Sequence, residues 1–187
     1  MKEDIVKSLQ VLRDGGIILY PTDTIWGLGC DATNAEAVAR ICRIKKREDS
    51  KSMLVLVDDE KRLYRYVSTV PDMAIDITRI ADKPVTIIYP GVDGLASNLI
   101  AEDGSTGIRI TTDPFCRQLI RHLGRPVVST SANISGENPP SIFREISDEI
   151  KSAVDYIVTH RQNETRKGMP SPVIKIGLNN EIQILRQ

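Results

Sequence analysis

The chain has 187 residues, with 25 basic and 25 acidic side chains, so its formal net charge is zero. This length favours one domain over residues 1–187 with a substantial core, and the balanced charge indicates no general attraction to nucleic acid. No apolar run is long enough to span a membrane, and the first ten residues lack a signal-peptide pattern. We therefore expect a cytoplasmic protein without a membrane partner.

The cysteines and histidines exclude several kinds of site. Cys30, Cys42 and Cys116 are isolated from one another, and an odd number without close pairs argues against disulfides and against a zinc cluster. His122 and His160 are too few for a histidine-based metal site. The sequence therefore predicts no metal site made by protein ligands.

The first part of the chain predicts alternating helices and strands. Gly15-Gly16 ends an amphipathic helix, Thr33 and Glu36 fit a capping box, and Asp58 fits an N-cap. Apolar spacing then predicts helices over Asp4–Asp14, from Thr33, from Asp58 to Tyr66 and over Pro71–Ile80, and strands over Ile17–Tyr20 and Met53–Val57. The helix from Thr33 has Val38, Ile41 and Cys42 on its apolar face. In the helix over Pro71–Ile80, we expect Met73, Ile77 and Ile80 to be buried.

The second part predicts more strands than helices. Asp113-Pro114 fits an N-cap followed by a first-turn proline, and Gly124 fits the end of the same helix at Leu123. The further elements are strands over Pro84–Tyr89, Thr106–Ile110 and Pro126–Thr130, a loop over Ser131–Pro140, a helix over Ser141–Ile150, a strand over Tyr156–Thr159, and a hairpin of Val173–Ile176 and Ile182–Leu185 around Asn179-Asn180. This order predicts an α/β fold with a twisted, mixed parallel and antiparallel sheet flanked by helices.

The stretch from Gly15 to Val57 carries the most chemistry. Pro21–Thr24 places three hydrogen-bonding side chains in a turn, and Trp26 and two glycines follow. After a short helix comes a basic loop with Arg43, Lys45, Lys46, Arg47 and Lys51. An anion would fit between the hydroxyl-rich turn and the basic loop. The alternative is a solvated basic helix end that complements the helix dipole.

The sequence has neither GxxxxGK[ST] nor GxGxxG, and no Ser/His/Asp or Cys/His set is recognisable. A nucleotide would therefore have to be bound by cationic side chains, hydroxyls and backbone N–H groups. Side chains of these kinds lie near predicted strand ends, which line the ligand crevice in wound sheets. They are Thr22, Thr24, Lys45, Arg47, Lys51, Ser105, Arg109, Ser129, Ser131, Asn133, Ser171 and Arg186.

Each candidate has a structural alternative. Arg109 interrupts an apolar strand, so its guanidinium either pairs with an internal carboxylate or faces a cleft and binds a substrate carboxylate. The threonines, the serines and Asn133 could be ordinary turn residues, and Arg186 could be a solvated arginine on an edge strand. We expect Asp23 to be a turn residue rather than a general base, and Lys46 to face solvent.

Three motifs follow one another along the chain: YPTDTIWGLG at Tyr20–Gly29, K-x-R at Lys45-Lys46-Arg47, and S-x-N at Ser131-Ala132-Asn133. In this order they resemble the motifs of the YrdC family of L-threonylcarbamoyl-AMP synthases. The resemblance covers nearly the whole chain. It implies a curved sheet flanked by helices with a deep basic cleft. It also implies the short form of the family, without the extra C-terminal domain of longer members.

The resemblance implies an enzyme that joins L-threonine, bicarbonate or CO2 and ATP into threonylcarbamoyl-AMP and pyrophosphate. Magnesium would enter with ATP, and a tRNA-modifying threonylcarbamoyl transferase complex would use the product. Direct binding of tRNA or double-stranded RNA is left open. No residue is assigned as acid or base. The implied ATP-binding residues are Lys45, Arg47, Lys51, Ser105, Ser131, Asn133 and Arg186, and the implied threonine-binding residues are Thr24, Arg109, Ser129 and Ser171.

Some positions depart from the family pattern. Glu48 replaces the usual proline after K-x-R, Leu56 stands where some members have histidine, and Asp82–Thr86 replaces P-G-P-x-T. These changes leave open a YciO-like paralogue that binds nucleotide but not threonine. A non-enzymatic RNA-binding module is a further alternative, although Trp26 is the only aromatic side chain beside the basic loop that could stack on a base.

Overall fold

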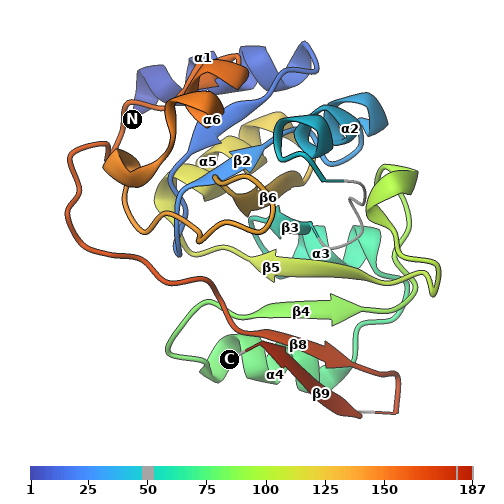
Figure 1. Cartoon of the computed structure of the whole chain (residues 1–187). Helices are drawn as coiled ribbons and strands as arrows, with labels where there is room; N and C mark the ends of the chain where they lie inside the picture. The colour runs from blue at the N-terminus through green and yellow to red at the C-terminus, as the bar shows by residue number, and fades with distance from the viewer. Residues whose placement is uncertain (48–52, 180, 187) are drawn as a thin grey trace.

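The structure is a computed structural model that describes residues 1–47, 53–179 and 181–186. The described strands form one nine-stranded sheet in the order β7-β1-β2-β6-β3-β5-β4-β8-β9 (Figure 1). The strands are β1 (Ile18–Tyr20), β2 (Gly27–Gly29), β3 (Leu54–Val57), β4 (Thr86–Tyr89), β5 (Thr106–Ile110), β6 (Val127–Ser131), β7 (Tyr156–Ile157), β8 (Val173–Ile176) and β9 (Ile182–Arg186).

The sheet is mixed, as predicted. The pairs β1–β7, β3–β5 and β4–β8 are parallel, whereas β1–β2, β2–β6, β3–β6, β4–β5 and β8–β9 are antiparallel. Parallel pairs require crossover connections, and most of the helices occupy those connections. The α/β class with flanking helices is therefore confirmed.

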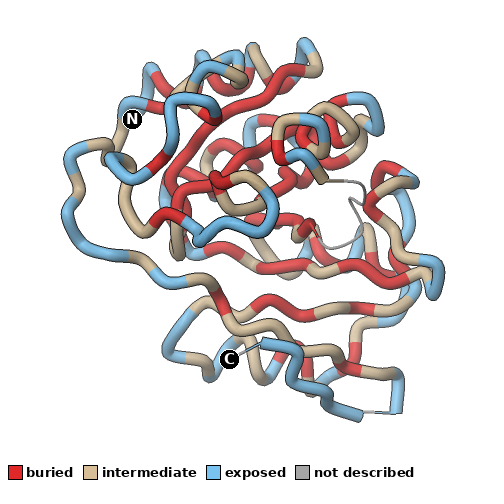
Figure 2. The backbone as a smooth tube through the Cα atoms, in the orientation of Figure 1, coloured by how far each residue is buried: buried red, intermediate tan, exposed pale blue. Residues whose placement is uncertain are grey.

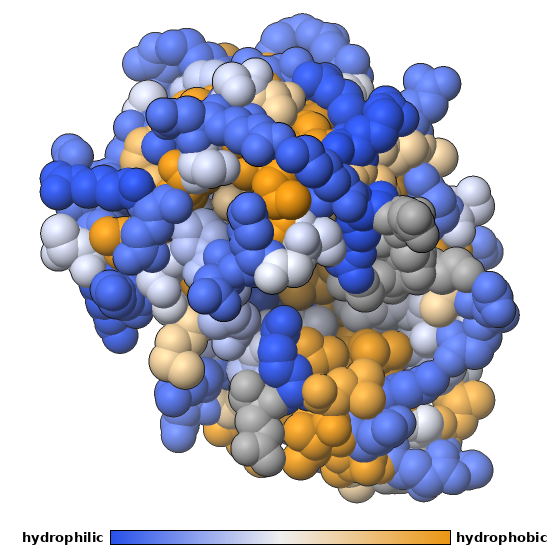
Figure 3. Space-filling view, viewed as in Figure 1, coloured by the Kyte–Doolittle hydropathy of each residue, from blue (hydrophilic) through white to orange (hydrophobic). Residues whose placement is uncertain are grey.

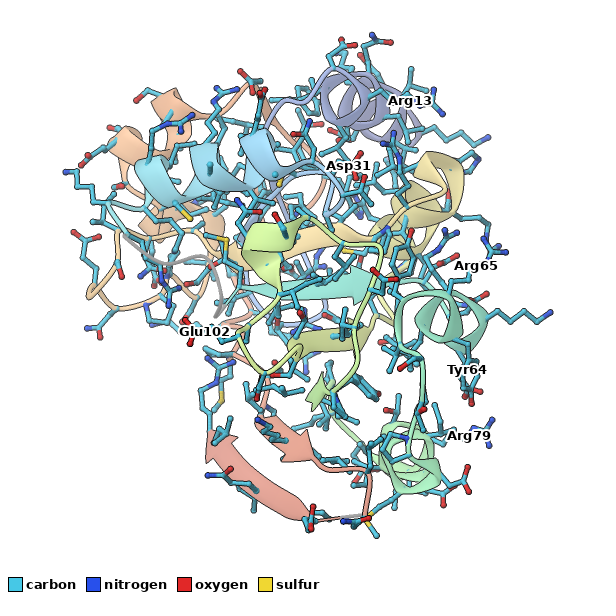
Figure 4. All side chains as sticks on the ribbon, turned by 90° about the vertical axis from the view of Figure 1, so that its right-hand side faces the viewer. Arg13, Asp31, Tyr64, Arg65, Arg79 and Glu102 are labelled. Carbon is cyan, nitrogen blue, oxygen red and sulfur yellow. The ribbon has the colours of Figure 1, made fainter. Side chains whose placement is uncertain are left out.

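The helices are α1 (Lys2–Arg13), α2 (Ala35–Ile44), α3 (Glu60–Tyr66), α4 (Asp72–Ile80), α5 (Pro114–Leu123) and α6 (Asp148–Ala153), with short 3-10 turns η1 (Ser97–Leu99) and η2 (Phe143–Glu145). In the view of Figure 1, α3, α4 and α5 lie behind the sheet. Tyr64 and Arg65 on α3 and Arg79 on α4 point away from the sheet (Figure 4). The opposite face of the sheet is therefore the one that these helices leave open.

The helix caps confirm one prediction and correct two. Asp113 accepts a hydrogen bond from the backbone N–H of Cys116 at 2.9 Å, Pro114 follows it, and Gly124 ends α5 with φ of 79°, all as predicted. The N-cap of α2 is Asn34 rather than Thr33, whose hydroxyl donates to Asp31 instead.

The N-cap of α3 is likewise one residue away from the predicted position. Asp59 accepts from the backbone N–H of Arg62 at 2.8 Å. Asp58, the predicted cap, forms an ion pair with the guanidinium of Arg62. In both helices two neighbouring residues had side chains able to cap, and backbone geometry selected the second.

Other boundaries also differ from the prediction. The strand β2 was not expected, and Ser141–Ile150 contains η2 followed by the start of α6 rather than one continuous helix. On α4 the buried residues are Ala74 and Ile75, while Ile80 is 78% exposed and was predicted wrongly. The hairpin of β8 and β9 is confirmed; Asn180 lies outside the described residues.

Burial is concentrated on the central strands, whereas β9 is exposed along its length (Figure 2). Within the described part of the chain, none of the helices has both the length and the apolar character needed to cross a bilayer. The core therefore supports the middle of the sheet, and β9 forms an outer edge.

Asp4 provides a test of how α1 is attached to the sheet. This buried carboxylate accepts hydrogen bonds from Thr159 N at 2.6 Å, Thr159 Oγ1 at 2.9 Å and Tyr156 Oη at 2.9 Å. Burial alone would raise the pKa of Asp4, but these hydrogen bonds lower it to about 2. A carboxylate with a lowered pKa stabilises the fold above its ordinary pKa and loses that contribution as the pH falls.

We predict that Asp4→Asn lowers the free energy of unfolding by about 2 kcal/mol at pH 7. The difference from the wild type should shrink as the pH falls from about 4 to 2. Urea unfolding at several pH values measures both quantities. Asp76→Asn, at an exposed position on α4, is the control and should have little effect. An Asp4→Asn deficit that is equal at every pH would contradict the prediction.

Candidate functional site

A cavity of about 510 Å³ lies on the open face of the sheet, and we call it the central cavity. The surface in Figure 3 is hollowed above the apolar area that covers β8 and β9. The lining residues of the central cavity come from seven strands, the turn after β1 and three further loops. They are Thr24, Ile25, Trp26, Gly27, Arg47, Met53, Leu54, Thr86, Ile88, Gly107, Arg109, Ser129, Thr130, Ser131, Pro139, Pro170, Ser171, Val173, Leu185 and Arg186.

Most of the candidate residues predicted from the sequence meet in this cavity. The lining includes Thr24, Arg47, Arg109, Ser129, Ser131, Ser171 and Arg186. Lys51 lies outside the described residues. Lys45, Ser105 and Asn133 are not among the lining residues. The particular ligand roles of all these residues stay predictions, as do the depth and overall charge of the cleft.

Arg109 combines both alternatives that its sequence position allowed. Alternation along β5 directs Ile108 into the core and Arg109 to the cavity wall. The Nη2 atom of Arg109 lies 2.8 Å from Oδ1 of Asp23, and both side chains are buried. An internal carboxylate therefore pairs with Arg109, while the guanidinium also contributes to the cavity surface.

Asp23 connects the turn after β1 to the end of β5. Its Oδ2 accepts hydrogen bonds from Thr111 Oγ1 at 3.0 Å and from Thr112 N at 3.3 Å. In the same turn, Thr22 Oγ1 donates to the carbonyl of Ile25 at 2.7 Å. The Thr22 hydroxyl thus satisfies the turn, and Thr24 is the threonine that lines the cavity.

Ser171 is a meeting point for two arginines. Its hydroxyl accepts a hydrogen bond from Nη1 of Arg109 at 3.1 Å and lies 2.8 Å from the hydroxyl of Thr86. Its carbonyl accepts from Nε and Nη2 of Arg186 at 3.0 and 2.8 Å. Partial burial of the guanidinium lowers the pKa of Arg186, and the positive charge of Arg109 lowers it further. An anion bound in the cavity would relieve this repulsion between like charges.

Ser171 was predicted from the sequence, but the contribution of the segment that precedes it was not. Residues 158–172 descend along the left side of the molecule in Figure 1 and reach β8. The backbone of Gly168 lies directly against that of Thr24. A Cβ atom added at Gly168 would be only 1.9 Å from the Thr24 carbonyl oxygen. Only glycine allows this approach. The isolated glycine before Met169-Pro170 was the available signal.

The same segment borders a second cavity of about 530 Å³, the side cavity. The two cavities share Thr24–Trp26 and Pro170-Ser171. The side cavity mixes charges of both signs, and its other lining residues are Thr22, Asp23, Asp82, Lys83, Pro84, Ser141, Ile142, Arg161, Glu164, Arg166, Lys167, Gly168, Met169 and Pro172. Because the side cavity is lined by acidic as well as basic groups, it is less suited to binding an anion than the central cavity is.

Besides Thr22, three described candidates lie outside the central cavity, and all three make local hydrogen bonds. The hydroxyl of Ser105 donates to Asp103 at 2.5 Å, beyond the opposite end of β5 from Arg109. The amide of Asn133 donates to the carbonyls of Ile134 and Glu137 at 2.9 and 2.8 Å. Lys45 is buried, and its ammonium donates to the carbonyls of Ser131 and Asn133 at 2.5 and 2.7 Å.

The central cavity is suited to binding anions. Its described lining contains Arg47, Arg109 and Arg186, together with serine and threonine hydroxyls, and no carboxylate. Guanidinium groups bind carboxylates and phosphates through paired N–H donors. In the described part of the chain, no three His, Cys, Asp or Glu side chains are grouped closely enough to bind a metal ion.

The buried pair of Arg109 and Asp23 yields a prediction about stability. Removing one member of such a pair leaves the other charge buried without its counter-ion, which costs about 3–5 kcal/mol. We predict that Arg109→Leu lowers the free energy of unfolding by this amount. Adding Asp23→Asn should recover part of the loss, because the stranded charge is then removed. Denaturant unfolding of the two single variants and the double variant measures the coupling, and strictly additive losses would contradict it.

Curated relatives resemble the chain in sequence. A threonylcarbamoyl-AMP synthase of Pseudoalteromonas translucida (strain TAC 125) is 31% identical over 182 residues, which cover 95% of each chain. A threonylcarbamoyl-AMP synthase of Idiomarina loihiensis is 32% identical over 171 residues, or 89% of this chain and 90% of the relative. The similarity therefore extends over nearly the full length of these relatives.

Solved structures share the fold. P. abyssi Sua5, solved in complex with L-threonine, superposes with a TM-score of 0.82 at 25% identity over 92% of this chain; this chain spans only 50% of the Sua5 chain. E. coli YciO gives a TM-score of 0.85 at 26% identity over 100% of this chain and 90% of YciO. Residues 10–187 match the family described as "Telomere recombination", which comprises Sua5, YciO and YrdC. The chain belongs to the Sua5/YciO/YrdC family.

Proposed function

We propose that the protein is an L-threonylcarbamoyladenylate synthase, a nucleotidyltransferase that makes threonylcarbamoyl-AMP and pyrophosphate from L-threonine, bicarbonate or CO2, and ATP. The observation that carries this proposal is the set of three arginines and several hydroxyls around one cavity whose described lining contains no carboxylate. The names of the curated relatives supply the reaction.

L-Threonine binds on the Arg109 side of the central cavity in this proposal. The guanidinium of Arg109 is held by Asp23 and Ser171, so it presents a fixed fork to the substrate carboxylate. Thr24 and Ser129 contribute hydroxyls to the lining of the same cavity. The P. abyssi Sua5 complex with L-threonine supports a threonine site in this fold.

ATP, carrying Mg²⁺ as part of the substrate, occupies the remainder of the cavity. Arg47 and Ser131 face the phosphates, and Arg186 closes the nucleotide side. Ile88, Val173 and Leu185 form an apolar part of the lining that suits the adenine ring. Lys51, outside the described residues, is a further predicted phosphate ligand.

The chemistry requires positioning and charge neutralisation more than acid–base catalysis. The amine of threonine adds to CO2 and forms a carbamate, whose oxygen attacks the α-phosphorus of ATP and displaces pyrophosphate. The arginines neutralise the carboxylate and the phosphates, and the hydroxyls orient them. The adenylate then passes, in the cytoplasm, to a threonylcarbamoyl transferase complex that modifies tRNA.

The activity assay has to distinguish this function from two alternatives. The match to E. coli YciO over the whole chain keeps a YciO-like paralogue as one alternative. In this alternative the protein would bind nucleotide without using threonine. A module that binds tRNA or double-stranded RNA through stacking has less support, because Trp26 is only 4% exposed and its ring packs against Phe143 with a centroid distance of 4.8 Å.

We predict that the purified protein releases pyrophosphate from ATP and Mg²⁺ only when both L-threonine and bicarbonate are present. Coupled detection of pyrophosphate, with mass spectrometry of the labile adenylate, measures the reaction. Omission of threonine is the control. Pyrophosphate release at the same rate without threonine would refute the threonine assignment, and nucleotide binding without any turnover would favour the paralogue.

The basic loop gives a second prediction. Removing the guanidinium in Arg47→Ala should weaken ATP binding by about 1.5–3 kcal/mol, because a charge-assisted contact to phosphate is lost. Lys46→Ala is the matched control, since Lys46 is exposed and pairs with Glu149 outside the cavity. Isothermal titration with a non-hydrolysable ATP analogue compares the two variants. Equal affinities would mean that Arg47 does not contact the nucleotide.

A further inference from the structure

The side chain of Lys45 lies beneath the loop that follows β6, which we call the 131–137 loop. Lys45 is the C-cap residue of α2 and is 2% exposed. Its ammonium donates to the carbonyl oxygens of Ser131 and Asn133 at 2.5 and 2.7 Å. Two of its three N–H donors are therefore used within the protein, and Lys45 is not part of the described cavity lining.

The backbone of Lys45 contacts the same loop. Its carbonyl accepts a hydrogen bond from the N–H of Ser135 at 2.9 Å. On the other side of the loop, the N–H of Ala132 donates to the carbonyl of Trp26 at 3.3 Å, in the turn that borders the cavity. Lys45 thus contacts the loop at residues 131, 133 and 135, close to the point where Ser131 enters the cavity lining.

Burial of an ammonium costs free energy unless its N–H donors are satisfied. An apolar side chain could fill the same space without this cost, so packing alone does not explain a lysine at this position. The carbonyls of Ser131 and Asn133 satisfy it by adopting one particular loop conformation. The hydrogen bonds therefore offset the desolvation of the ammonium only when the loop has this conformation. Arg47, two residues further along, remains on the cavity wall.

We propose that Lys45 is a positioning residue that fixes the 131–137 loop, so that Ser131 is presented to the nucleotide, rather than a direct ligand of the phosphates. This inference rests on the proposed function, because it assigns a task within the same site. It separates the two basic residues of the K-x-R motif, since Lys45 builds the site and Arg47 faces the ligand.

The charged groups around Lys45 make the positioning sensitive to pH. Burial, and to a smaller extent the charge of Arg47, lower the pKa of Lys45 to about 8, although Glu137 in the loop opposes the shift. Above about pH 8 the side chain therefore becomes a neutral amine, and its hydrogen bonds to the two carbonyls lose their charge assistance. The loop should loosen over the same interval.

Hydrogen–deuterium exchange of the ligand-free protein tests the proposal without relying on activity. In Lys45→Met, the amides of residues 132–137 should exchange about tenfold faster or more, because two charge-assisted hydrogen bonds are lost. Amides of β3 and β5 should keep their wild-type rates. Lys46→Met is the matched control for loss of one positive charge, and its loop should exchange at the wild-type rate.

The pH dependence of the wild type provides a second measurement that needs no variant. After correction for the intrinsic exchange rate, loop amides should exchange faster at pH 9 than at pH 7. In steady-state assays the KM for ATP should rise above about pH 8 in the wild type, and Lys45→Met should have a raised KM at every pH without that rise.

The outcomes separate the proposal from its competitors. Unchanged loop exchange in Lys45→Met together with weakened ATP binding would overturn it in favour of a direct phosphate ligand. Faster exchange throughout the sheet would overturn it in favour of a general structural role. A wild-type loop whose corrected exchange is independent of pH would also contradict it. Absence of synthase activity in the wild type would refute the proposed function and leave the exchange result to be judged separately.

Discussion

The buried ion pair between Arg109 and Asp23 is the interaction on which the central cavity depends. It joins β5 to the turn between β1 and β2, and Arg109 also reaches Ser171 on the segment that leads into β8. Three parts of the chain that are distant in sequence therefore meet at one guanidinium. Because a buried charge without a partner is costly, the fold tolerates few alternative positions for these parts. The pair thereby sets the shape of the cavity before any ligand enters.

Lys45 has a comparable role at the loop that follows β6. Arg109 contacts a carboxylate and a hydroxyl, whereas Lys45 contacts the two carbonyls of the loop after β6. Both cations donate hydrogen bonds to other groups of the protein. Such preorganised groups lower the cost of binding, because the ligand does not have to order them. Positive charge in this site is thus divided between residues that hold the cavity together and residues, such as Arg47, that line it.

Sequence patterns predicted the fold where local signals were unambiguous, as for β5 and for the start of α5 at Asp113. They failed where neighbouring residues have the same chemistry, so that Asn34 replaced Thr33 as the cap of α2. The strand β2 was missed because its two glycines are typical of turns rather than strands. For the site, strand ends and motifs found most of the cavity lining. They could not show the depth of Lys45 or the approach of Gly168 to Thr24, because both depend on tertiary packing.

The most direct test of this account is a crystal structure of the protein with L-threonine and a non-hydrolysable ATP analogue. The account predicts the threonine carboxylate on the guanidinium of Arg109, with Asp23 still paired to it. It also predicts the phosphates beside Arg47 and Ser131, and Lys45 still bonded to the loop carbonyls. Nucleotide bound in the side cavity, or Arg109 turned away from both Asp23 and threonine, would contradict it.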